Sequence, residues 1–344
     1  MASTLDEYLV QFRNGNTEIR PPATAPQRRR WQEATGKARG YYLLKETLPG
    51  PVFDLAVTRG YRGLRAAVGR GPGSGRILPD FLVLGFAKCG TTSLFDWVCE
   101  HPMVARPRTR GRARKELLFF DYRFDEGLDW YRAHFPLRSE RDQFEREHGR
   151  PFLTGEATAS YVSGYRIPER VQQAVPQAKL IVTLRNPVDR AYSAFQMSRR
   201  ERLEEHESFE TAIALEADRL APEEARVRVD PRYDPPAPAP LGYWSYLQRS
   251  RYDEHVARWL ARFPREQMLF LKFEDLAADP QSTLDQVYAF LGLAPHRHAE
   301  FRKLNVGSYE EQVHPDTRAH LNAYFRPHNE RLRELTGIDF GWDD

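Results

Sequence analysis

From residue 79 onward, short apolar runs alternate with segments of helical periodicity, and this alternation limits the possible fold more than any other feature of the sequence. The apolar runs occupy residues 81–86, 151–156, 179–185 and 267–276, and the helical patterns occupy residues 91–101, 186–200 and 282–293. A short continuous apolar run suits a strand that is buried on both faces of a parallel sheet. Strands that alternate with helices form such a sheet, with the helices packed on its faces. We therefore predict an α/β fold, in which a single domain over residues 79–344 has a central parallel sheet flanked by helices.

Residues 1–78 have a different composition. They contain the stretches RPPATAPQRRR, LPGP and GRGPGSGR, which are rich in turn-forming residues and arginine. Residues 52–68 have the spacing of an amphipathic helix. We predict that residues 1–78 form an N-terminal extension, partly flexible, that ends in a joint near Gly71–Gly75.

The composition excludes several classes of protein. Of the 344 residues, 41% are hydrophobic and 29% are charged, which is typical of a soluble globular protein rather than a disordered one. The net charge of +3 does not indicate nucleic-acid binding, and two cysteines provide no disulfide framework. The N-terminus lacks the pattern of a secretory signal, and no apolar run approaches the roughly 18 residues of a membrane span. We expect a cytoplasmic protein without a transmembrane segment.

The stretch GFAKCGTTS follows the first apolar run and opens the first helical pattern. A strand, a glycine turn and a helix start together form an anion-binding loop, because the first N–H groups of a helix lack partners within it and its dipole favours negative charge. The glycines let the backbone approach a ligand, a lysine adds positive charge, and hydroxyl residues add donors: Gly85, Gly90, Lys88, Thr91, Thr92 and Ser93. We therefore predict a P-loop-like site for a phosphate compound.

Two common classes of phosphate-binding protein do not fit this loop. The motif of nucleotide triphosphatases has a lysine directly after its second glycine. This chain has Thr91 at that position, and its lysine, Lys88, lies inside the loop. A cysteine phosphatase generally has an arginine six positions after its cysteine, whereas Phe95 stands at that distance from Cys89. The side chain of Cys89 is therefore expected to fill space within the loop.

Two stretches together resemble motifs of the sulfotransferases, which take a sulfuryl group from 3′-phosphoadenosine 5′-phosphosulfate (PAPS). GFAKCGTTSL is similar to their 5′-phosphosulfate-binding loop, and LIVTLRNPVDRAYSAF is similar to their 3′-phosphate-binding segment. An arginine at a strand end can bind a phosphate through two hydrogen bonds, and a serine on the next helix can add another. The resemblance extends from about residue 80 to the C-terminus. It implies a donor site formed by Lys88, Cys89, Gly90, Thr91, Thr92, Ser93, Arg185 and Ser193.

The resemblance also implies two catalytic residues, Lys88 and Glu116. By analogy with phosphoryl transfer, Lys88 would neutralise charge on the leaving phosphate. Residues 114–136 resemble the heparan-sulfate branch, in which a glutamate before an aromatic pair is taken as the catalytic base, and Glu116 matches that glutamate. The alternative base is a histidine, as in the branch that sulfates phenols and steroids, and His101 is the nearest candidate.

The heparan-sulfate branch implies a carbohydrate-like acceptor with a hydroxyl or amine group. An arginine-rich run at residues 106–115 lies between the donor loop and the expected base, where it is suited to attract an anionic saccharide, although a solvated loop explains it equally well. The expected acceptor contacts are Arg112, Arg114 and Glu156. The alternative functions are sulfation of a small non-sugar metabolite and nucleotide binding by a catalytically inactive relative.

The chain also departs from that branch. In GEATASYV, Ala157 and Ala159 replace a lysine and a proline of the 3-O-sulfating enzymes, so a second catalytic lysine is not implied. No cysteine follows residue 99, which removes the C-terminal disulfide loop of that branch. His314 and His328 are expected to hold structure or border the nucleotide, and neither has partners at metal-ligand spacing, so no metal is predicted. No aromatic residues are interleaved with the arginines for base stacking, so no nucleic-acid partner is predicted.

Overall fold

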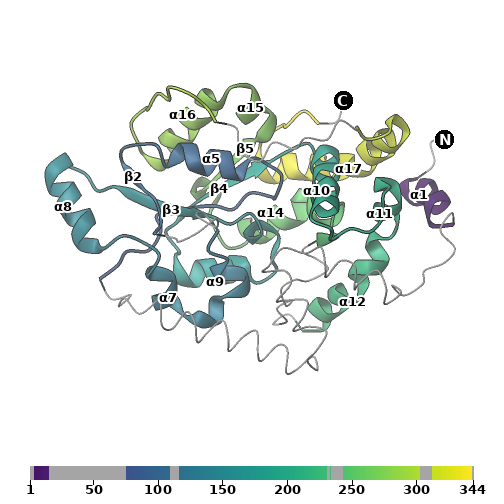
Figure 1. Cartoon of the computed structure of the whole chain (residues 1–344), viewed down its shortest axis with the longest axis horizontal. Helices are drawn as coiled ribbons and strands as arrows, with labels where there is room; N and C mark the ends of the chain where they lie inside the picture. The colour runs from purple at the N-terminus through teal and green to yellow at the C-terminus, as the bar shows by residue number, and fades with distance from the viewer. Residues whose placement is uncertain are drawn as a thin grey trace. The chain divides into compact units, whose positions relative to one another are not determined.

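The computed structural model describes residues 4–14, 75–108, 116–230, 233, 243–302 and 312–342. Within this part of the chain, five parallel strands form one sheet in the order β2-β3-β1-β4-β5 (Figure 1). The strands are β1 (Phe81–Val83), β2 (Val104–Ala105), β3 (Leu153–Ala157), β4 (Lys179–Leu184) and β5 (Met268–Lys272). The prediction of an α/β fold with a central parallel sheet is confirmed.

Helices connect the strands, and further helices precede β1 and follow β5 in the sequence. They are α1 (Leu5–Asn14), α5 (Thr91–Val98), α6 (Phe119–Tyr122), α7 (Leu128–Arg132), α8 (Arg138–His148), α9 (Ile167–Ala174), α10 (Pro187–Arg200), α11 (Phe209–Ala214), α12 (Glu216–Val229), α14 (Tyr252–Leu260), α15 (Phe273–Ala278), α16 (Pro280–Leu291) and α17 (Pro315–Thr336). The start of α10 agrees with its sequence signal, because the side chain of Asn186 accepts hydrogen bonds from the amides of Val188 and Asp189 and Pro187 is the first helical residue.

Side chains from the strands enter apolar clusters on both faces of the sheet. Phe81 and Val83 of β1 pack in one cluster with side chains of α5 and α16, whereas Leu82 packs in another with side chains of α9 and α14 (Figure 1). Because helices cover both faces, the strands need apolar residues at successive positions. This burial explains why the strands were recognisable in the sequence as continuous apolar runs.

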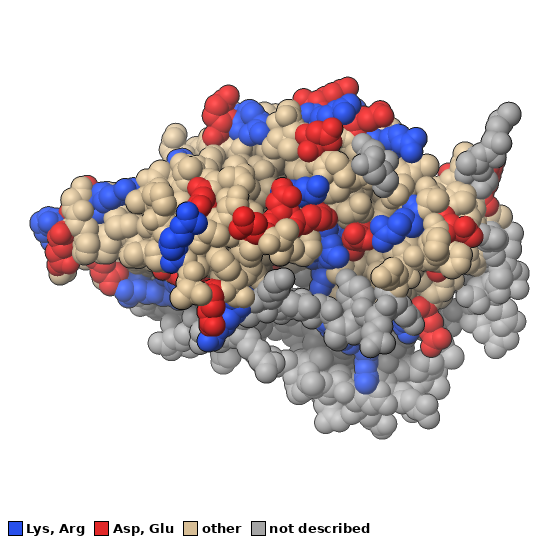
Figure 2. Space-filling model, turned by 90° about the horizontal axis from the view of Figure 1, so that it is seen from above, with Lys and Arg blue, Asp and Glu red and all other residues tan. Residues whose placement is uncertain are grey.

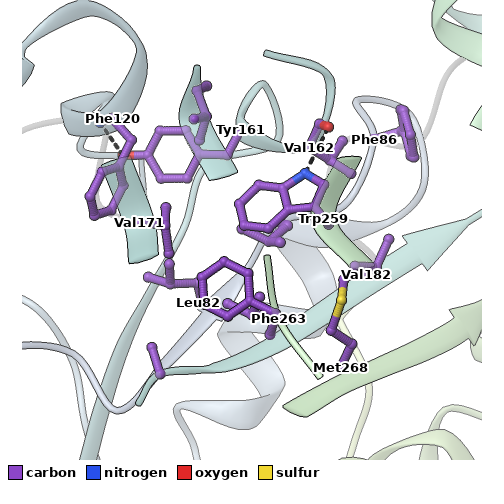
Figure 3. Packing of buried hydrophobic residues seen from close by; sticks show 14 of the residues in the cluster. Leu82, Phe86, Phe120, Tyr161, Val162, Val171, Val182, Trp259, Phe263 and Met268 are labelled. Carbon is purple, nitrogen blue, oxygen red and sulfur yellow. Dashed lines mark hydrogen bonds between the residues drawn. The ribbon is translucent and has the colours of Figure 1, made fainter. Parts of the chain in front are cut away.

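The core on the α9 and α14 face contains a fully buried tryptophan, Trp259 of α14. Figure 3 shows its ring near Phe263, with Leu82 and Val182 projecting from the strands. The indole Nε1 of Trp259 donates a hydrogen bond to the carbonyl oxygen of Val162 over 3.0 Å. This bond satisfies the one polar group of the indole, as burial requires. It also attaches the turn that follows β3 to α14.

A third apolar cluster joins α10, α11 and α17, and the first helix of the chain belongs to it. Leu5 and Leu9 of α1 are buried there, and the hydroxyls of Tyr8 and Thr317 hydrogen-bond over 2.7 Å. The predicted helix at residues 52–68 and most of the predicted joint lie outside the described residues. The predicted boundary at residue 78 stays a prediction.

The strand order creates one special position at the carboxyl edge of the sheet. β1 lies between β3 and β4. The chain leaves β1 towards the β3 side, whereas it leaves β4 towards β5. In open parallel sheets, ligands bind where successive connections diverge in this way. A ligand-binding site is therefore expected at the loop after β1 and the residue after β4.

The strand predicted at residues 267–276 was too long at its C-terminal end. β5 ends at Lys272, and the following acidic segment forms α15, with Glu274 and Asp275 in its first turn. Carboxylates near a helix N-terminus interact favourably with the helix dipole, which favours this helix over an extended strand. β2 was not predicted, because a strand of only Val104–Ala105 has no recognisable period.

Candidate functional site

The loop between β1 and α5 packs tightly against its surroundings at Gly85. A Cβ atom at this position would lie 2.3 Å from both Thr183 Oγ1 and Thr91 Cγ2. The backbone of the loop therefore lies directly against β4 and the first turn of α5, where no side chain fits. The amide of Leu84 extends the attachment to β4 by donating to the carbonyl of Ile181 over 2.8 Å.

Gly90 is the N-cap residue of helix α5, and its φ of 76° lies in the left-handed region. A glycine has no side chain with which to cap the first amide groups of the helix, so a bound anion can take that role. Thr91 and Ser93 are buried in this first turn, and Thr92 is half-buried. The turn combines backbone amides with three hydroxyl groups, as the sequence motif predicted.

Lys88 has a left-handed backbone conformation, with φ of 78°. This conformation is uncommon for a residue other than glycine and persists only where the surroundings hold it. Its side chain is half-buried, and burial lowers the pKa of Lys88, as do the charges of Arg200 and Arg185. A partly desolvated cation among other cations is a favourable environment for an anionic ligand.

Arg185, directly after β4, lies beside this loop. Its Nη1 donates to the backbone carbonyl of Lys88 over 3.4 Å, and its guanidinium lies over the ring of Phe273, 4.9 Å from the centroid. The hydroxyl of Tyr252 donates to the carbonyl of Arg185 over 2.9 Å. The two motifs found in the sequence thus meet at the carboxyl ends of the adjacent strands β1 and β4.

Arg190, a buried arginine on α10, was not predicted from the sequence to belong to the site. Its Nε donates to the carbonyl of Ala87, next to Lys88, over 3.3 Å. Its Nη1 donates to the carbonyls of Ser245 and Tyr246 over 3.3 and 3.1 Å. Arg190 therefore supports the loop from the protein interior. The second arginine of the RNPVDR stretch was the available signal, but the sequence alone does not show that its side chain turns inward.

Cys89 points into the hydrophobic core and is fully buried. Burial raises the pKa of its thiol to about 12, so the group is neutral near pH 7. Its backbone amide donates within the loop to the carbonyl of Phe86 over 3.1 Å. This placement agrees with the expectation that the side chain fills space. Ser193, the other residue expected to bind the donor, is buried on α10.

Glu116 is half-buried and lies just before α6. The pKa of Asp121 is raised to about 6, mainly by burial, and the negative charge of Glu116 contributes to the rise. The structure therefore places the two acidic groups near each other. Arg112 and Arg114, the expected acceptor contacts, lie outside the described residues.

Glu156 does not have the position expected of an acceptor contact. It is completely buried at the carboxyl end of β3, where burial raises its pKa to about 7. Its oxygens accept hydrogen bonds from the hydroxyls of Tyr131 and Thr158, each over 2.7 Å, and from Tyr161 over 3.0 Å. A carboxylate enclosed by protein donors is not exposed to a substrate, so the predicted contact is not supported.

His101, the alternative base, lies at the opposite end of α5 from the loop. It is buried, with its Nε2 hydrogen-bonded to the carbonyl of Ala294 over 3.0 Å and its Nδ1 accepting from the amide of Met103 over 3.0 Å. Burial lowers its pKa. Both ring nitrogens are therefore engaged in structural bonds, away from the carboxyl edge of the sheet.

His314 and His328 also make structural contacts. His314 caps α17 by accepting from the amide of Asp316, and Nδ1 of His328 pairs with Asp253 over 2.9 Å. Within the described ranges, no group of three or more His, Cys, Asp or Glu side chains is arranged to hold a metal ion.

Figure 2 shows the face that carries α15 and α16, on which acidic and basic side chains are interspersed. The described residues of this face form no large patch of one charge. Among the described helices, none combines the length and apolar character needed to cross a membrane.

Residues 78–312 match the family model of the sulfotransferase domain. The human protein named bifunctional heparan sulfate N-deacetylase/N-sulfotransferase 3 is 30% identical over 281 residues, which cover 75% of this chain and 30% of that protein. Human heparan sulfate glucosamine 3-O-sulfotransferase 3B1 is 30% identical over 299 residues, which cover 79% of this chain and 67% of that protein.

One of the similar solved structures is also a sulfotransferase. A sulfotransferase from Alicyclobacillus acidocaldarius is 32% identical, with a TM-score of 0.53 and coverage of 76% of this chain and 97% of that one. The chain spans less than a third of the first human relative and about two thirds of the second. Because the family model matches more than half of its residues, this chain belongs to the sulfotransferase family.

Proposed function

We propose that the protein transfers the sulfuryl group of PAPS to a hydroxyl or amine group of a carbohydrate. The observation that carries the proposal is the contact between Arg185 and the backbone of Lys88 at the carboxyl edge of the sheet. Two cationic residues from separate motifs thus lie side by side, as a site for both the 5′ and the 3′ group of a doubly phosphorylated nucleotide would require. The similarity to two heparan sulfate sulfotransferases supports a saccharide acceptor.

In this proposal the 5′-phosphosulfate lies at the N-terminus of α5. The first-turn amides, Lys88 and the hydroxyls of Thr91, Thr92 and Ser93 bind it. Arg185 and Ser193 bind the 3′-phosphate. A guanidinium has five N–H donors, so the bond from Arg185 to the Lys88 carbonyl leaves donors for a bidentate phosphate contact.

The chemical step is an in-line displacement at sulfur. The acceptor oxygen or nitrogen forms a bond to sulfur while the bond between sulfur and the 5′-phosphate oxygen breaks. The acceptor proton passes to Glu116, and the products are a sulfated saccharide and adenosine 3′,5′-bisphosphate. Lys88 stabilises the negative charge that grows on the leaving phosphate oxygen, so its contribution is largest in the transition state.

Product analysis tests this function. The protein is incubated with PAPS and a panel of glucosamine-containing saccharides, phenols and small alcohols, and the products are identified by mass spectrometry. We expect the mass of one sulfuryl group to be added to a saccharide, at nitrogen or at oxygen. Transfer only to non-sugar compounds would overturn the acceptor assignment, and nucleotide binding without any transfer would overturn the reaction itself.

A further inference from the structure

Two buried side chains, Glu156 of β3 and Tyr161 of the turn that follows it, hold the backbone that comes after the proposed base. The Oε2 atom of Glu156 accepts a hydrogen bond from the amide of Leu117 over 3.3 Å. The hydroxyl oxygen of Tyr161 accepts from the amide of Phe119 over 2.8 Å. It also accepts from the amide of Phe120 over 3.3 Å (Figure 3). Three amides within four successive residues are thus bound by two side chains, one from β3 and one from the turn after it.

These two side chains also fix each other. The hydroxyl of Tyr161 donates to Oε1 of Glu156 over 3.0 Å, and neither residue has exposed surface. Tyr131 and Thr158 complete the set of donors around the Glu156 carboxylate. Trp259 attaches the turn after Tyr161 to α14 through the carbonyl of Val162. A buried polar network in which every bond is made has little freedom to move.

The segment that is held in this way contains a strained residue. Leu118 has φ of 54°, a left-handed conformation that is an outlier for a bulky side chain. Such strain persists only when neighbouring contacts fix it. Further contacts act on the same segment, because Arg170 donates to the carbonyl of Phe120 over 2.7 Å and Ser160 donates to the carboxylate of Asp121 over 2.5 Å.

We propose that Glu156 and Tyr161 are positioning residues for Glu116. They fix the backbone directly after it and so hold the proposed base in place, without contacting substrate. This inference rests on the proposed function, since it needs Glu116 to be the base. Proton transfer depends on geometry, and a displacement of roughly 1 Å can reduce a rate by about a hundredfold.

The chain offers a matched pair of variants. Tyr131 and Tyr161 are both fully buried, and both donate to Oε1 of Glu156. Of the two hydroxyls, that of Tyr161 accepts from the amides of the base segment. Tyr131→Phe and Tyr161→Phe each remove one donor from the carboxylate, but Tyr161→Phe also releases Phe119 and Phe120. Glu156→Gln serves as a second variant if Tyr161→Phe does not fold.

The first measurement does not depend on activity. Hydrogen–deuterium exchange is followed in the peptide that covers residues 116–122, in the parent and in both tyrosine variants. We expect exchange of this peptide to accelerate by at least about tenfold in Tyr161→Phe and to change by less than about threefold in Tyr131→Phe. Equal protection in both variants would overturn the proposed role of the tyrosine, whether or not the protein transfers sulfuryl groups.

The second measurement is a double-mutant cycle on turnover. Tyr161→Phe should lower kcat by about tenfold or more and leave the affinity for adenosine 3′,5′-bisphosphate unchanged, whereas Tyr131→Phe should retain most of the rate. In a Glu116→Gln background, Tyr161→Phe should change the residual rate by less than about twofold, because the base is already lost. Equal losses in both backgrounds would overturn positioning through Glu116. A parent that transfers to no acceptor would refute the proposed function and leave the exchange result to decide whether the segment is held.

Discussion

The guanidinium of Arg185 donates to the backbone carbonyl of Lys88 over 3.4 Å, although 97 residues separate them in the sequence. The two residues meet because β1 and β4 are neighbours in the sheet and both end at the same edge. The contact brings the two motifs together at one place in the fold. The loop supplies amides and a lysine, and the strand end supplies an arginine whose guanidinium lies against the loop.

Lys88 is expected to act mainly in the transition state. Lys88→Ala should lower turnover far more than donor affinity, because the charge on the leaving phosphate develops only as the bond to sulfur breaks. Turnover and binding of adenosine 3′,5′-bisphosphate are measured on the same preparations. Lys179→Ala is the control, since Lys179 begins β4 at the other edge of the sheet. Equal losses of turnover and affinity would contradict this role.

Glu116 and His101 should respond differently to substitution. Glu116→Gln keeps the size of the side chain but cannot accept the proton, so we expect turnover to fall by about a hundredfold or more with little change in donor binding. His101→Ala should lower thermal stability and retain turnover, because His101 holds Ala294 and Met103. An active Glu116→Gln variant together with an inactive, well-folded His101→Ala variant would assign the base to the histidine.

Arg185 should recognise the 3′-phosphate. A hydrogen bond to a charged group contributes roughly 1.5–3 kcal/mol, so Arg185→Ala should weaken binding of adenosine 3′,5′-bisphosphate by at least about tenfold. Adenosine 5′-monophosphate lacks the 3′ group and should bind weakly to both proteins, with almost no difference between them. Calorimetric titration of both nucleotides checks this. If both lose affinity alike, the arginine supports the loop or the fold instead.

Buried carboxyls should make the stability of the protein depend on pH. Burial raises the pKa of Glu156 and Glu216 to about 7 and that of Asp121 to about 6. Between pH 4.5 and 7 the folded state therefore binds more protons at these groups than the unfolded state, and their contribution to the free energy of unfolding falls as pH rises. Urea unfolding at several pH values between 4.5 and 7 measures how steeply the free energy of unfolding falls with pH.

The slope of the free energy of unfolding against pH should become smaller when one of these carboxyls can no longer titrate. Glu216→Gln is the suitable variant, because Glu216 is a buried carboxyl outside the proposed donor-binding and base residues, and it accepts from the amides of Tyr246, Leu247 and Gln248. An unchanged slope in Glu216→Gln would show that this carboxyl titrates alike in the folded and unfolded states.

The sequence by itself determined the local elements and the motifs. The strands at β1 and β4, the capping of α10 by Asn186 and the strand–loop–helix arrangement around Lys88 all depend on residues that are near each other in the chain. Hydrophobic periodicity, helix caps and glycine turns act over a few residues, so they are readable without the fold. The alternation of strands and helices then led to a parallel sheet.

Only the tertiary structure decided which of the chemically similar residues meet. Glu156 was expected at the acceptor, yet β3 places it in the interior, where Tyr131 and Tyr161 surround it. His101 was a candidate base, yet the end of α5 places it against Ala294. A carboxylate or an imidazole has the same local sequence signal in a core as in an active site. Its burial and its partners come from segments far away in the chain, and strand pairing and helix packing bring those segments together.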